Sequence, residues 1–93
     1  MYIILAYDVN KKRVGKVLKI CRKYLLDVQK SVFEGILTGK QLASLKNELA
    51  SCILPQEDHI CIYVMESTKY VTKQEIGKVK VHRDIYWLSS LNE

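Results

Sequence analysis

Glycine, proline and paired cysteines are scarce in this chain of 93 residues, and each scarcity excludes a class of protein. One proline and four glycines leave no linker or low-complexity tract, so we expect a single domain over residues 1–93. Cys21, Cys52 and Cys61 include no C-x-x-C pair, which argues against a disulfide framework and against a zinc site. Apolar runs are short and no basic leader precedes the first one, so we expect a cytoplasmic protein.

Acidic residues are also few: ten stand against fifteen basic ones, for a net charge of +5. This excess favours a polyanionic partner such as nucleic acid, through counterion release. The imbalance is sharpest after Asp8, where residues 11–23 hold seven cations and no acid. The chain has no HExxH motif, no phosphate-binding glycine loop and no Ser/His/Asp order typical of a triad, which argues against those catalytic classes.

Hydrophobic periodicity predicts an α+β fold. We expect a strand over residues 2–7, a helix over 11–25, two short strands or one bulged strand over 28–37, a helix from the capping box Thr38–Gln41 to Pro55, and a strand over 59–66. Residues 78–81 and 85–88 are further strand candidates. This order suits a ferredoxin-like βαββαβ sandwich with an additional C-terminal strand.

The same pattern predicts self-association. Two helices cover only one face of a four-stranded sheet, yet the strands at 2–7 and 59–65 are apolar on both faces. The open face would leave a large hydrophobic patch in water. We therefore expect a homodimer that packs through the sheet, with the C-terminal segment, about residues 70–93, packing on the partner subunit.

Asp8 ends the first strand, and two interpretations of it stay open. In the first, which residue type and position alone favour, Asp8 caps the following helix or pairs with Lys11 or Lys12. In the second, Asp8 meets its symmetry mate in the dimer, and the pair binds Mg²⁺, which accepts one or two carboxylates beside water and phosphate oxygens. Phosphodiester hydrolysis is a reaction that such a site serves.

The helix over 11–25 is two-faced. Apolar residues form one stripe, and the opposite side carries a basic ridge, flanked by Arg13 and Arg22, that consists of Lys12, Lys16, Lys19 and Lys23. This ridge suits contact with a phosphate backbone or, equally, is a solvated helix face. His59 and His82 are interpreted as strand-edge and surface residues. The aromatic residues Tyr2, Tyr7 and Phe33 are expected to pack in the core and not to stack on bases.

Two motifs resemble a known family. Tyr7-Asp8-Val9 after an apolar strand, followed by a basic helix and then by the string V-Q-x-S-V-F-E-G over residues 28–35, is similar to the Cas-two (Cas2) family of CRISPR-associated proteins. The string includes Ser31 and Phe33, and the likeness covers nearly the whole chain. The chain departs from the family pattern at Leu25-Leu26, where glycine is frequent, and at Asp27, where arginine is frequent.

The resemblance implies a ferredoxin-like homodimer, with Asp8 as the catalytic residue and as the ligand of one Mg²⁺ that two Asp8 side chains share. It implies endonuclease activity on single-stranded RNA, double-stranded DNA or both, with Lys12, Arg13, Lys16 and Lys19 on the nucleic-acid backbone. It also implies a partner, the Cas-one integrase, during the acquisition of new spacers. The alternatives are a non-catalytic scaffold between integrase and DNA and, less favoured, a toxin-like messenger-RNA interferase.

Overall fold

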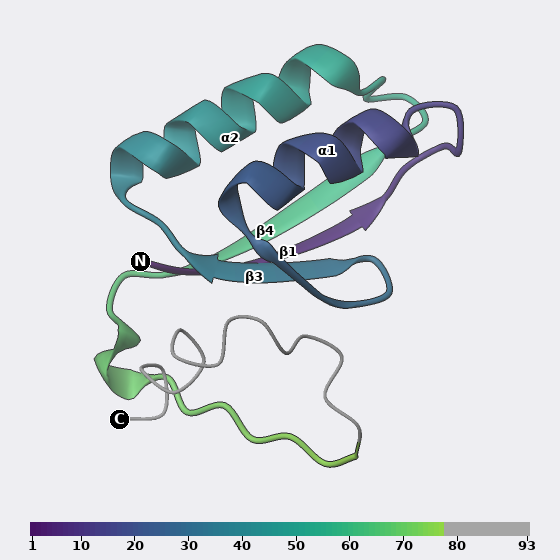
Figure 1. Ribbon diagram of the computed structural model, residues 1–93. Helices are drawn as coiled ribbons and strands as arrows, with labels where there is room; N and C mark the ends of the chain where they lie inside the picture. The colour runs from purple at the N-terminus through teal and green to yellow at the C-terminus, as the bar shows by residue number, and fades with distance from the viewer. Residues whose placement is uncertain (78–93) are drawn as a thin grey trace.

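The computed structural model describes residues 1–77, whose elements follow the predicted order. They are β1 (Tyr2–Asp8), α1 (Val14–Tyr24), β2 (Leu26–Gln29), β3 (Val32–Ile36), α2 (Gly39–Cys52), β4 (His59–Met65) and a short 3-10 helix, η1 (Thr68–Tyr70). The strands form an antiparallel sheet in the order β2-β3-β1-β4, and both helices lie on one face of it (Figure 1). The predicted ferredoxin-like α+β fold is confirmed.

Most of the predictions for the C-terminal segment concern residues beyond 77, which the structure does not describe. The strand candidates at 78–81 and 85–88, and with them the additional C-terminal strand and His82, lie outside the described residues. The assignment of residues 1–93 to one domain, with the segment 70–93 packing on a partner, therefore stays a prediction.

The first helix begins later than the sequence predicted. α1 starts at Val14, because residues 11–13 form a turn that Asn10 closes. The Asn10 carbonyl accepts the Arg13 amide at 2.8 Å, and the Asn10 side chain accepts the Lys12 amide at 3.0 Å. Asparagine side chains commonly hold such turns by accepting a backbone N–H two residues on. Lys12 therefore lies in the β1–α1 connection and not on the helical face that carries Lys16 and Lys19.

The second helix and the β2–β3 hairpin agree with the sequence. Thr38 Oγ1 accepts the Gln41 amide at 3.1 Å, and Gln41 Oε1 accepts the Thr38 amide at 2.9 Å, so the predicted capping box opens α2. β2 and β3 are two short strands, and their register shifts between Asp27 and Gln29. Both forms expected for residues 28–37, paired strands and a bulge, therefore occur together.

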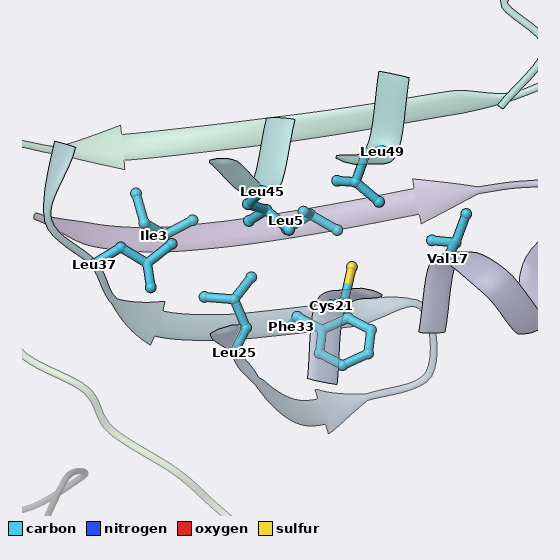
Figure 2. Close-up of a cluster of buried hydrophobic side chains, with 9 residues drawn as sticks. All are labelled: Ile3, Leu5, Val17, Cys21, Leu25, Phe33, Leu37, Leu45 and Leu49. Carbon is cyan, nitrogen blue, oxygen red and sulfur yellow. The ribbon is translucent and has the colours of Figure 1, made fainter. Parts of the chain in front are cut away.

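The hydrophobic core lies between the sheet and the two helices (Figure 2). Strands, helices and their connections contribute nine buried side chains to it: Ile3, Leu5, Val17, Cys21, Leu25, Phe33, Leu37, Leu45 and Leu49. Gly35 permits the chain at the end of α1 to approach β3 closely, since a Cβ there would lie 2.6 Å from Leu25 Cδ2. The glycine of the V-F-E-G string therefore has a packing role.

The opposite face of the sheet is largely apolar. Ile3 and Leu5 point into the core, so the alternation of a strand directs Tyr2, Ile4 and Ala6 away from the helices. The register carries this face across the sheet to Ile36 and Tyr63, which are 37% and 58% exposed. We call this surface the open face.

One charged side chain is buried on the open face. Glu34 is 5% exposed and accepts a 2.5 Å hydrogen bond from the hydroxyl of Tyr2. Lys73, in the segment that follows η1, forms an ion pair with the same carboxylate. Burial and the neighbouring Glu34 carboxylate raise the pKa of Tyr2 well above its usual range. This contact joins the segment after η1 to the sheet face that the helices leave uncovered.

Candidate metal and nucleic-acid site

Asp8 is an exposed carboxylate at the carboxyl end of β1. It follows the same alternation as Ile4 and Ala6, so it lies at the edge of the open face. Its side chain has no hydrogen bond or ion pair within residues 1–77, and no side chain caps α1, whose N-cap is Arg13. The interpretation of Asp8 as a helix cap, or as a partner of Lys11 or Lys12, is therefore wrong: the turn at Asn10 moves the helix start too far along the chain.

Tyr7, Ser31 and Phe33, the remaining motif residues, come together next to Asp8. The rings of Tyr7 and Phe33 lie 5.9 Å apart at 38°, and Phe33 is fully buried. The Tyr7 amide donates to the Ser31 carbonyl at 3.1 Å, and Ser31 adopts a left-handed conformation with φ 65° in the β2–β3 turn. These residues therefore fix the backbone that carries Asp8. The prediction that Tyr7 and Phe33 pack in the core agrees with this geometry, whereas Tyr2 is buried on the open face, where it donates to Glu34.

Arg13 is engaged within the chain, which the sequence did not indicate. Its Nε donates to Asp58 Oδ2 at 2.6 Å, and its Nη2 donates to Asp58 Oδ1 at 3.0 Å and to Glu57 at 3.1 Å. Asp58 also accepts the amides of Asn10 and Leu54, both at 2.9 Å. The hydrogen bonds from Arg13 hold the pKa of the Asp58 carboxyl well below its usual range. The only signal in the sequence was an acidic pair directly before an apolar strand.

This ion pair changes the expected role of Arg13. Its guanidinium side chain is only 18% exposed, and two carboxylates balance its charge. A phosphate would have to compete with a bidentate pair whose carboxylate is buried. We therefore leave Arg13 out of the surface that we assign to nucleic acid and regard it as the residue that fixes the start of α1.

The lysines of the basic ridge are exposed, and those on α1 border a groove against α2. The groove has a volume of about 490 Å³ and is lined by Lys16, Lys19, Ile20, Lys23, Glu48, Ser51 and Cys52. Glu48 forms an ion pair with Lys23 and accepts a hydrogen bond from the hydroxyl of Tyr24. Lys16 and Lys19 have no hydrogen bond or ion pair in the part of the chain that the structure describes.

Asp27, in β2, lies close to a cation of α1. Its carboxylate lies 3.8 Å from the guanidinium of Arg22, so this acid offsets one flank of the ridge. Of the predicted backbone contacts, Lys12, Lys16 and Lys19 remain as exposed cations. Lys16 and Lys19 lie on the helical side of the sheet and Asp8 on the other, so the structure does not bring the ridge and the carboxylate together.

One chain supplies only part of a metal site. Within residues 1–77 there is no group of three or more His, Cys, Asp or Glu side chains that could hold a metal ion. The donor at Asp8 nevertheless fits a hard divalent cation, because it is a carboxylate, is exposed and is not engaged by a cation of the chain. Further donors would have to come from a second subunit, a substrate phosphate or water.

No helix within residues 1–77 has the length and hydrophobicity needed to cross a membrane.

Residues 1–73 match the family model described as CRISPR associated protein Cas2. A CRISPR-associated endoribonuclease Cas2 of Thermotoga maritima is 48% identical over 80 residues, which are 86% of this chain and 92% of that protein. One of Dictyoglomus turgidum is 43% identical over 84 residues, 90% of this chain and 97% of that protein.

A comparison with solved structures supports the same family. A crystal structure of Cas2 superposes with a TM-score of 0.75 at 38% identity and covers 86% of this chain and 90% of that one. The residues that the family model matches include β1 with Asp8 and the V-F-E-G string, which are the features that the geometry singles out. The chain belongs to the family of CRISPR-associated Cas2 proteins.

Proposed function

We propose that this protein is a cytoplasmic CRISPR adaptation protein, a homodimeric and metal-dependent endonuclease in which Asp8 of each subunit is the catalytic residue. The observation that carries the proposal is the exposed Asp8 carboxylate, at the edge of an apolar sheet face and without a partner within residues 1–77. The names of the relatives, which describe endoribonucleases, support single-stranded RNA as the first substrate to test and double-stranded DNA as the second.

The open face supports the proposed dimer. Ile36 and Tyr63 expose apolar surface there, and burial against a second copy would remove it from water. A two-fold axis that passes next to Asp8 would bring the two Asp8 side chains toward each other. One Mg²⁺ per dimer, shared by both carboxylates, is the cofactor that this arrangement fits.

The residues of the proposed site have three different roles. Asp8 supplies the oxygen ligands, and Mg²⁺, when bound, supplies charge neutralisation at the scissile phosphate and activation of a water molecule. Lys12, Lys16 and Lys19 hold the phosphate backbone by charge without reading sequence. Tyr7, Ser31 and Phe33 fix the backbone of the strand end that carries Asp8.

A second candidate function is a non-catalytic scaffold that holds the Cas-one integrase and prespacer DNA together. The specific observation in its favour is the separation of the helical lysines from Asp8, on opposite sides of the sheet. A backbone-binding surface of this kind works without the carboxylate. Both candidates belong to spacer acquisition, and they differ in whether Asp8 is needed.

The experiment compares RNA and duplex DNA cleavage by the wild type, Asp8→Ala and Glu66→Ala, with Mg²⁺ and with chelator. The control Glu66 is also an exposed acid, directly after β4. We expect Asp8→Ala to lower cleavage by roughly a hundredfold or more, and Glu66→Ala to leave it unchanged. Cleavage that survives in Asp8→Ala would contradict the nuclease proposal. Spacer integration and integrase co-purification that survive the same change would support the scaffold.

A further inference from the structure

His59 is the residue directly opposite Asp8. In the β1–β4 ladder these two residues are register partners, at the end of the sheet where β1 finishes and β4 begins. Opposite residues of an antiparallel pair project on the same face, so the imidazole shares the edge of the open face with the carboxylate. Both side chains are exposed, and neither has a hydrogen bond or ion pair within residues 1–77.

The spacing suits a shared cation. Directly opposite Cβ atoms lie about 4.5–5.5 Å apart, which is close enough for the carboxylate and the imidazole to reach one metal ion at bond lengths of about 2.0–2.2 Å. Exposed side chains change rotamer readily, so both donors can turn toward one point. The nearby Asp58 carboxylate does not compete, because Arg13 and two backbone amides hold it on the helical side.

We propose that His59 is a second ligand at the Asp8 site and that its nitrogen lets the site bind Mn²⁺ as well as Mg²⁺. The inference rests on the proposed function, which uses Asp8 and a two-fold dimer. Two copies of Asp8 and two of His59 supply four protein donors, more than the carboxylates alone. Magnesium prefers oxygen donors and keeps its water shell, whereas imidazole is a suitable ligand for transition metals.

The test uses the full-length protein and Mn²⁺ as the probe. Electron paramagnetic resonance of free Mn²⁺ measures the affinity, and electron spin echo modulation detects a nitrogen nucleus bonded to the metal. We expect nitrogen modulation in the wild type and its loss in His59→Gln, with Mn²⁺ affinity lowered roughly tenfold. Glu66→Gln, which changes an exposed acid beyond the other end of β4, should keep both the modulation and the affinity.

The outcomes distinguish the proposed ligand role of His59 from the proposed nuclease function. Bound Mn²⁺ without nitrogen modulation in the wild type overturns the ligand role of His59, and this result needs no variant to fold. Failure of Mn²⁺ to bind overturns it as well. If nitrogen modulation is present but cleavage survives in Asp8→Ala, the metal site stands and the nuclease proposal fails. If Asp8→Ala abolishes cleavage and no nitrogen is detected, the nuclease stands without His59.

Discussion

Arg13 Nε donates a 2.6 Å hydrogen bond to a carboxylate oxygen of Asp58, 45 residues away in the chain. The Asp58 side chain is fully buried and also accepts two backbone amides. This pair connects the β1–α1 turn to the loop before β4, and Asp8 and His59 stand on the two strands that these segments extend. The geometry of the candidate site therefore depends on an ion pair that does not itself belong to it.

Asp58→Asn should lower Tm at pH 7 by roughly 10 °C, because a buried bidentate ion pair is lost. The pKa of Asp58 is depressed in the folded protein, so its contribution is complete above the unfolded pKa of about 3.9 and is lost as the pH falls below that value. Thermal unfolding between pH 7 and pH 3 should show the difference in Tm between wild type and variant begin to narrow below about pH 4. The control Glu57→Gln changes a carboxylate that is 53% exposed, and an equal loss there would contradict the assignment.

Alanine substitutions at Gly35 and Gly15 should change the free energy of unfolding in opposite directions. Gly35→Ala places a Cβ 2.6 Å from Leu25 Cδ2 and 3.4 Å from Leu25 Cα, so we expect a loss of about 1–3 kcal/mol in the free energy of unfolding. Gly15→Ala, in the first turn of α1, meets nothing within 4 Å and should gain up to about 1 kcal/mol. Urea denaturation measures both. A stable Gly35→Ala protein would show that α1 has room to shift.

Lys16→Glu with Lys19→Glu should weaken nucleic-acid binding and flatten its salt dependence. Each lost phosphate contact removes about 0.9 from the slope of log K against log salt concentration on duplex DNA. The matched control is Lys40→Glu with Lys46→Glu, which changes two exposed lysines on α2 by the same total charge. Fluorescence anisotropy across a salt series separates the two variants. An equal change in both slopes would point to overall charge and not to the groove.

Tyr63→Lys should shift the protein from dimer to monomer at micromolar concentration, because it places a charge in the apolar open face. Leu54→Lys is the control: Leu54 is 44% exposed, yet lies in the connection before β4 and away from that face. Light scattering coupled to gel filtration gives the mass of each. A monomeric wild type would remove the dimer and, with it, the shared metal site.

Local signals in the sequence were sufficient for most of the fold. The apolar runs of β1 and β4, the stripe that includes Val17 and Cys21, and the Thr38–Gln41 capping box each involve only a few neighbouring residues, so they can be identified from the sequence. The start of α1 was misplaced because the Asn10 turn competes with a helical pattern that continues through Lys11 and Lys12. Asp8 and the V-F-E-G string were also identifiable, since both follow recognisable strands.

The pairings of distant residues were decided only by the tertiary structure. The sequence predicted that Arg13 contacts phosphate. In the folded protein it forms ion pairs with Asp58 and Glu57 instead. His59 read as a strand-edge residue, and strand register made it the neighbour of Asp8. Periodicity and capping depend on neighbours along the chain, whereas these contacts depend on which strands pair and in what register. The sequence by itself determined the elements and the candidate carboxylate; the assembled sheet decided what lies beside that carboxylate and which cations remain free to act.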